Sequence, residues 1–98
     1  MSRQVPQFEL GDYPVWKDMT VVAARTLYYW EERYWLAVLT VDTVHEEKTR
    51  RNVQIYRWRW RKDRDGNLRW QRDQQHTINK AQLWEDTKLA VDEMLKYL

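Results

Sequence analysis

The sequence predicts an α+β fold in which a four-stranded antiparallel curved sheet is followed by one C-terminal amphipathic helix (ββββα), with two chains forming a dimer. Residues 20–43 contain two β-branched and aromatic runs around a polar turn, and residues 53–76 contain two more. Residues 79–98 carry apolar side chains at helical spacing. One helix covers only one face of such a sheet. Leu89 and Leu95 therefore lack an intrachain partner, which predicts a homodimer or a larger homo-oligomer.

Length and composition narrow the class of protein. The 98 residues suffice for one domain with a modest core. There is no cysteine, and His45 and His76 are the only histidines, so we expect no metal site and no cofactor. No run approaches the roughly 20 apolar residues of a membrane span, and the first residues lack the apolar core of a signal peptide. We therefore expect a cytoplasmic protein that does not enter a membrane.

The N-terminal residues are expected to form an arm. Residues 1–18 contain Pro6, Gly11 and Pro14, which favour irregular structure with at most a short strand. Their apolar side chains can pack against the edge of the domain. Residues 19–98 are expected to form the single ββββα domain.

The first predicted hairpin joins residues 20–29 and 34–43 through a turn at Glu31 and Glu32. Because side chains alternate between the two faces of a strand, one face is better suited to the core. Tyr29 and Tyr34 fall on the opposite face. The predicted core face holds Val22, Ala24, Tyr28, Trp35, Ala37, Leu39 and Val41.

Residues 44–52, with the sequence VHEEKTRRN, are charged and show no period. They predict a mobile connection between the two hairpins. Lys48, Arg50 and Arg51 would then be free to reach a ligand.

The second predicted hairpin, residues 53–76, separates aromatic from basic residues most sharply. Tyr56, Trp58 and Trp60 share one face of its first strand, and Arg57, Arg59 and Arg61 share the other. Asp63-Arg64-Asp65-Gly66 fits a type I turn followed by a left-handed glycine. The predicted cross-strand pairs are Trp60 with Trp70, Trp58 with Arg72, Tyr56 with Gln74, Arg61 with Arg69, and Arg59 with Gln71.

A two-residue Asp-Gly turn is the alternative for this hairpin. It shifts the register by one residue and places Trp70 beside Arg61. The first register is favoured because it leaves no tryptophan among the arginines.

The C-terminal helix is predicted to begin with Asn79 as its N-cap, with Gln82 completing a capping box. Its apolar stripe comprises Leu83, Thr87, Ala90, Val91, Met94 and Leu98. We expect this stripe to cover the face of Tyr56, Trp58, Trp60 and Trp70, which leaves the arginine face in water. Whether Trp58, Trp60 and Trp70 are core or base-stacking residues stays open at this point.

Positive charge is concentrated in the second hairpin and just before it. Residues 50–72 hold nine Lys and Arg side chains against Asp63 and Asp65, whereas the whole chain has a net charge of only +2. Arg61 opposite Arg69, with no acid expected nearby, costs stability unless an anion binds. This segregation predicts a polyanionic partner. The candidate binding residues are Arg57, Arg59, Arg61, Lys62, Arg69, Arg50, Arg51, Lys48, Tyr29 and Tyr34.

Residues 55–98 resemble the C-terminal half of the positive-cofactor-four type transcriptional coactivators and of the ThermoDBP-like single-stranded DNA-binding proteins. The resemblance lies in the strand IYRWRW, the Asp-x-Asp-Gly hairpin, a strand that ends in Thr77-Ile78-Asn79, and a helix that opens with Trp84. It implies a homodimer built through the helices, with curved sheets whose exposed faces hold single-stranded nucleic acid.

The favoured function is therefore non-catalytic, largely sequence-independent binding of single-stranded DNA, with arginines on phosphates and aromatic rings on bases. Single-stranded RNA is the first alternative. The second is a protein-interaction or oligomerisation module with an aromatic docking surface. No pair of nucleophile and base, and no phosphate-binding glycine loop, suggests an enzyme.

Overall fold

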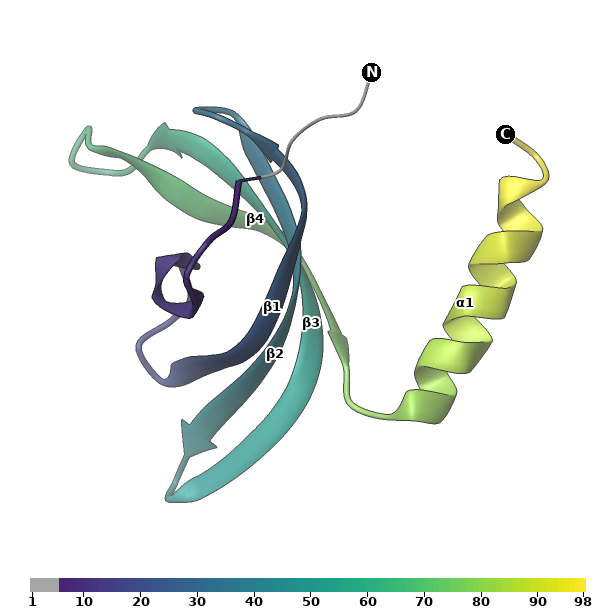
Figure 1. Cartoon of the computed structure of the whole chain (residues 1–98). Helices are drawn as coiled ribbons and strands as arrows, with labels where there is room; N and C mark the ends of the chain where they lie inside the picture. The colour runs from purple at the N-terminus through teal and green to yellow at the C-terminus, as the bar shows by residue number, and fades with distance from the viewer. Residues whose placement is uncertain (1–5) are drawn as a thin grey trace.

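A computed structural model describes residues 6–98 and has the predicted ββββα order (Figure 1). The four strands form one antiparallel sheet in the order β1-β2-β3-β4, and the single α-helix follows the last strand. The elements are η1 (Leu10–Asp12), β1 (Met19–Trp30), β2 (Tyr34–His45), β3 (Lys48–Lys62), β4 (Leu68–Ile78) and α1 (Ala81–Leu95).

The core lies on the face of the sheet that carries Tyr56, Trp58, Trp60 and Trp70, called here the aromatic face. In β2, burial alternates residue by residue from Trp35 to Val41, as the period of a half-buried strand requires. The rings of Tyr56 and Trp58 are stacked with centroids 5.1 Å apart. Besides Tyr13, the buried apolar residues are Trp35, Ala37, Leu39, Val41, Tyr56 and Trp58.

The expectation that the C-terminal helix covers the aromatic face is wrong. The N-terminal segment, residues 8–16, lies there, whereas α1 stands on the other side of the sheet (Figure 1). Phe8 packs on Trp35 with ring centroids 4.4 Å apart, and Tyr13 is buried beside them. This segment contains the 3-10 turn η1 instead of a short strand. Residues 1–5 of the predicted arm lie outside the described range.

Hydrogen bonding explains why this segment, and not a helix, closes the core. The buried indole of Trp58 donates from Nε1 to the carbonyl oxygen of Pro14 at 3.0 Å. Trp35 Nε1 donates to the Thr26 hydroxyl, which is also hydrogen-bonded to the Tyr13 hydroxyl at 2.9 Å. Buried N–H groups need such partners, and the apolar stripe of a helix has none to offer.

Two β-bulges in β1 change which residues point to the core. The pairing with β2 shifts between Val21 and Ala23 and again between Thr26 and Tyr28. Each bulge adds one residue and so reverses the alternation that follows it. The predicted core residue Ala24 does pack against the core. Val22 instead is exposed, and Val21 takes its place.

The predicted mobile connection at residues 44–52 is also wrong. Strand β2 continues to His45 and β3 begins at Lys48, so only Glu46 and Glu47 form the turn. Both have positive φ, 50° and 65°, which is the backbone of a type I′ turn. The long strands on either side hold this turn although neither residue is a glycine.

The β3–β4 hairpin follows the favoured register at its turn end, where Trp60 pairs with Trp70, Trp58 with Arg72 and Arg61 with Arg69. The Asp63 amide donates to the Asn67 carbonyl at 2.9 Å, as the predicted turn requires. Further along, an extra residue in β4 pairs Tyr56 with Gln75 instead of the expected Gln74.

Helix α1 begins at Ala81 with Lys80 in the N-cap position and no side-chain cap hydrogen bond. The predicted capping box of Asn79 and Gln82 is therefore not formed. No residue of α1 is buried, and β4 is the only described element that its backbone approaches. The covalent connection to β4 is thus the main link between the helix and the sheet, and packing contributes little.

We predict that Trp58→Ala lowers the free energy of unfolding by about 3–5 kcal/mol, because it removes a fully buried ring and its hydrogen bond to Pro14. Chemical denaturation followed by circular dichroism measures the change. Trp16→Ala is the control, since 61% of the Trp16 side chain is exposed. Equal losses in the two variants would contradict this placement of the core.

Candidate nucleic-acid interface

The face of the sheet opposite the core is called here the basic face, because it carries Arg57, Arg59, Arg61 and Arg69. Strand β3 has no extra residue, so these β3 arginines keep the predicted alternation with the buried aromatic residues. Cross-strand pairing places Tyr34, Arg59 and Gln71 in one row of this face. Arg61 and Arg69 form the next row toward the β3–β4 turn.

Arg57 is held by an acid that the sequence argument did not consider. Its guanidinium donates from Nε to the Asp73 carboxylate at 2.8 Å, and Nη2 forms an ion pair with the same oxygen. Asp73 is the extra residue between the β4 partners of Arg57 and Trp58. The hydrogen bond from Arg57 lowers the pKa of Asp73 from its usual value, and the nearby charges of Arg59 and Arg61 add to the effect.

Arg69 has an acidic partner as well. Its Nε lies 2.8 Å from the Asp63 carboxylate, whose other oxygen accepts hydrogen bonds from the backbone amides of Asp65 and Asn67. The turn therefore fixes this carboxylate in place. The expectation that Arg61 faces Arg69 with no acid nearby is corrected by this contact.

Arg59 and Arg61 differ from these two arginines. Among residues 6–98, neither has a carboxylate within ion-pair distance, and both side chains are exposed. Arg59 instead lies against Tyr34, with its guanidinium carbon 5.3 Å from the ring centroid and Nη2 3.4 Å from the hydroxyl. The basic face thus has two available cations between two ion-paired ones.

Aromatic rings accompany these cations. Tyr34 lies on the basic face as predicted, within 5.7 Å of the Arg57 guanidinium as well. Trp30 pairs with Tyr34 across β1 and β2 and is 47% exposed, with Arg33 4.8 Å from its ring. A β-strand pair shares one face, so Trp30 joins Tyr34 there. The sequence analysis did not place Trp30 on this face, because the bulges in β1 cannot be recognised from the alternation of apolar and polar residues.

Tyr29 was expected on the basic face and is not there. It packs against Phe8, Trp35 and Trp70 on the aromatic face. Burial raises the pKa of its hydroxyl, and Glu31 and Glu32 raise it further. The bulge between Thr26 and Tyr28 exchanges the two neighbouring tyrosines, so Tyr28 pairs with Leu36 on the basic face.

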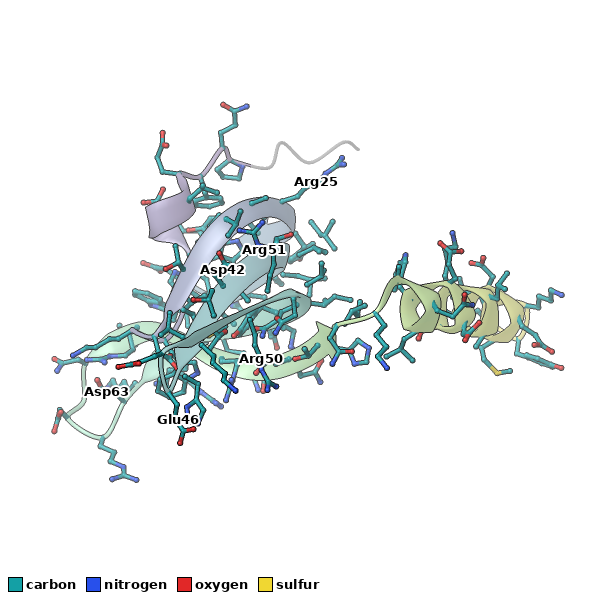
Figure 2. The ribbon with its side chains drawn as sticks, turned by 90° about the horizontal axis from the view of Figure 1, so that it is seen from below. Arg25, Asp42, Glu46, Arg50, Arg51 and Asp63 are labelled. Carbon is teal, nitrogen blue, oxygen red and sulfur yellow. The ribbon has the colours of Figure 1, made fainter. Side chains whose placement is uncertain are left out.

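The remaining predicted cations are not brought together with this cluster. Lys48, Arg50 and Arg51 begin β3, and Arg50 lies roughly 35 Å along the strand from Arg61 at the usual rise per residue. Arg51 donates two hydrogen bonds to Asp42, at 2.7 and 2.9 Å, and lowers the pKa of that carboxyl (Figure 2). Lys62 alternates with Arg61 and so belongs to the aromatic side.

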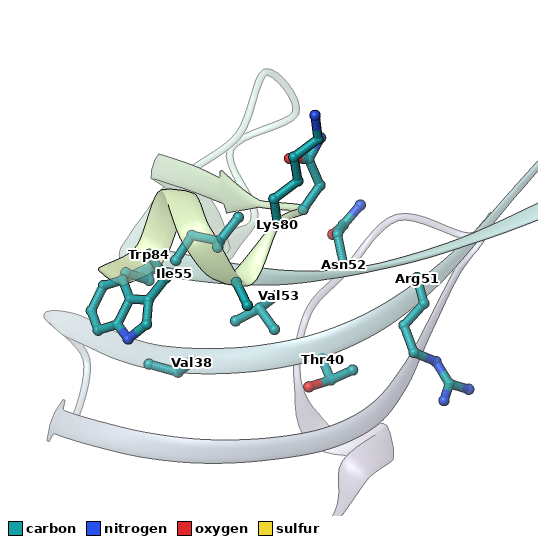
Figure 3. Close-up of a pocket in the computed structure, with 11 residues that line it drawn as sticks. Val38, Thr40, Arg51, Asn52, Val53, Ile55, Lys80 and Trp84 are labelled. Atoms are coloured by element: carbon teal, nitrogen blue, oxygen red, sulfur yellow. The ribbon is translucent and has the colours of Figure 1, made fainter. Parts of the chain in front are cut away.

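The other half of the sheet's outer side is apolar. A groove of about 600 Å³ lies between it and the start of α1, bordered by Val38, Val53, Ile55, Ile78 and Trp84 (Figure 3). Toward the β2–β3 turn, the outer side of the sheet therefore changes from the basic face to an apolar groove.

Within residues 6–98, no group of three or more His, Asp or Glu side chains is placed to hold a metal ion. No helix in the same range has the length and apolar character to cross a membrane. No protein-family model, curated protein or solved structure matches the chain.

We predict that Arg57→Gln raises the pKa of Asp73 toward the unperturbed value of about 3.9. In the parent, the lowered pKa means that this carboxylate stabilises the fold above pH ~4, and that this contribution is lost as the pH falls through the folded-state pKa. Carboxyl ¹³C chemical shifts measured against pH test this in both proteins. An Asp73 midpoint that does not move would contradict the ion pair.

Proposed function

We propose that the protein is a non-catalytic, largely sequence-independent binder of single-stranded DNA that uses the basic face. The observation that carries the proposal is the pair Arg59 and Arg61, which have no carboxylate within ion-pair distance among residues 6–98 and lie near the half-buried ring of Tyr34 and the exposed ring of Trp30. Cations that follow a backbone, combined with rings that accept any base, are the usual means of binding single strands.

Phosphate binding falls mainly to Arg59 and Arg61. Arg57 and Arg69 already share their charge with Asp73 and Asp63, so a phosphate would have to compete with a carboxylate for them. These two ion pairs also fix the edges of the cluster and limit the repulsion among four arginines. The expected ligand is therefore a single strand that crosses the basic face over the two adjacent rows that contain Arg59 and Arg61.

Base binding falls to Tyr34 and Trp30, which lie at the β1–β2 turn in the row of Arg59. A base stacked on an aromatic ring contributes about 1–3 kcal/mol, and the stack does not depend on which base it is. A duplex keeps its bases stacked internally, so it cannot use these rings. We therefore expect DNA single strands to bind more tightly than duplex.

The proposal includes kinship with the positive-cofactor-four and ThermoDBP-like proteins. The ββββα order and the turn at Asp63 support it, although fold alone is an argument by association. It also includes a homodimer, since the large apolar side chains of α1 are exposed. RNA single strands offer the same phosphates and bases and are therefore the comparison ligand in the tests.

We predict that replacing Arg59 and Arg61 by alanine weakens binding of labelled oligo-dT and flattens its salt dependence by about 0.7 per lost contact on a log-log plot. Fluorescence anisotropy at several salt concentrations measures both quantities. The control replaces Lys88 and Lys96 of the helix and its C-cap, which removes the same charge elsewhere. A folded Arg59/Arg61 variant with unchanged affinity would remove the basic face from the mechanism.

We further predict that Tyr34→Leu weakens oligo-dT binding by about 1–3 kcal/mol while the salt slope stays the same, because a stacking ring is lost and no phosphate contact. Tyr97→Leu is the matched control, as Tyr97 is 83% exposed beyond the end of α1. The same anisotropy titration measures it. A change in slope without a change in affinity at low salt would contradict a stacking role.

A further inference from the structure

A second cleft lies on the aromatic face, at the edge of the sheet that β4 forms. It has a volume of about 410 Å³ and is bordered by residues 14–16 of the N-terminal segment and residues 69–72 of β4. This volume is in the range of sites that hold small organic groups. The space is called here the edge cleft.

The hydrogen bond between Trp58 and Pro14 explains why Trp16 stands over this cleft. It fixes Pro14 above Trp58, and Trp58 pairs with Arg72 across β3 and β4. Two residues after Pro14, the Trp16 ring meets Arg72, whose guanidinium carbon lies 5.5 Å from the ring centroid. Trp16 is nevertheless 61% exposed, so Arg72 covers only part of it and the rest is open to another planar group.

Arg72 supplies a positive charge without an ionic partner. Its side chain is exposed, and no carboxylate among residues 6–98 lies within ion-pair distance of it. Its Nη1 donates to the side-chain oxygen of Gln75. Burial raises the pKa of the Tyr56 hydroxyl, the neighbouring Arg72 opposes this rise, and the charge of Asp18 adds to it. The guanidinium is therefore free to form charge-assisted hydrogen bonds to a phosphate.

The edge cleft is continuous with the basic face around β4. Its lining includes Arg69 and Gln71, which belong to the two rows of the basic face that contain Arg61 and Arg59. In the part of the chain that the structure describes, β4 is the last strand of the sheet, so no further strand separates the two faces there. A strand bound on the basic face therefore reaches the cleft by passing over β4 alone.

We propose that the edge cleft is a second single-strand contact, which takes one nucleotide of the strand that is bound on the basic face. The base stacks on Trp16, and its phosphate is bound by Arg72. The inference rests on the proposed function and extends its site to the opposite face of the sheet. A nucleotide brings together the planar ring and the anion that Trp16 and Arg72 accept, whereas an aliphatic ligand leaves Arg72 without a counter-ion.

The two contacts should differ in how they depend on the length of the strand. A short oligonucleotide occupies the basic face alone, whereas a longer one also passes over β4 into the edge cleft. A small single-strand-binding fold covers about 4–16 nucleotides. Labelled oligo-dT probes of about 5 and about 15 nucleotides therefore separate the two contacts.

We predict that Trp16→Leu weakens binding of the longer probe by at least about fivefold and does not change binding of the shorter probe, because one stacked base is lost. Trp16→Phe keeps a ring and is expected to retain most of the affinity. Arg72→Gln is expected to flatten the salt slope of the longer probe alone, by about 0.7 on a log-log plot. Fluorescence anisotropy at several salt concentrations measures these quantities.

Matched controls remove the same side chains elsewhere. Trp84→Leu changes an exposed tryptophan of α1, and Arg25→Gln changes an exposed arginine of β1, the opposite edge strand. Both are expected to leave binding of the two probes unchanged. Tyr34→Leu, on the basic face, is expected to weaken binding of both probes. Circular dichroism checks that each variant is folded.

The two probes distinguish a failure of this inference from a failure of the proposed function. A parent protein that binds neither probe would overturn both. A parent that binds both probes, with Trp16→Leu and Arg72→Gln equal to it on the longer one, would overturn the edge cleft and leave the basic face standing. Equal losses on the two probes would overturn the passage over β4, and a Trp16→Phe variant as weak as Trp16→Leu would overturn the stacking role.

Discussion

The regular alternation of β3 is the constraint on which the rest of the structure depends. This strand is paired along both edges and has no bulge of its own, so Tyr56 and Trp58 must enter the core while Arg57, Arg59 and Arg61 face water. A shift by one residue would bury arginines and expose tryptophans. The irregularities fall in other strands instead: β4 takes one bulge against β3, and β1 takes two against β2.

Acidic residues make four arginines on one sheet face compatible with a stable fold. Asp73 reaches the basic face only because it is the extra residue of the β4 bulge, and Asp63 is presented by the turn. The β4 bulge and the β3–β4 turn, which interrupt the regular strand pairing, therefore also place negative charges beside the arginines. Arg59 and Arg61, left between these pairs, remain the positions where an external anion gains most.

Period and turn chemistry were sufficient to predict the order of elements, the core positions of β2 and the register near the β3–β4 turn. They were not sufficient where one extra residue reverses the alternation, because Tyr28 and Tyr29 are the same residue type and the pattern does not show which one enters the core. The hydrogen-bond partner of the Trp58 indole could not be predicted from the sequence either, since Pro14 is 44 residues away. Of the candidate cations, only Arg57, Arg59, Arg61 and Arg69 of the second hairpin came together, because the alternation of side chains along each strand places them on one face.

The hydrogen bond between Trp58 and Pro14 has a consequence for how the chain matures. Residues 8–16, with Phe8 and Tyr13, leave the ribosome before β3 does. Until then these rings have no hollow to enter, and the core cannot close. The closing contact spans nearly half the chain, so folding should wait for most of the sheet and proceed as one late cooperative event.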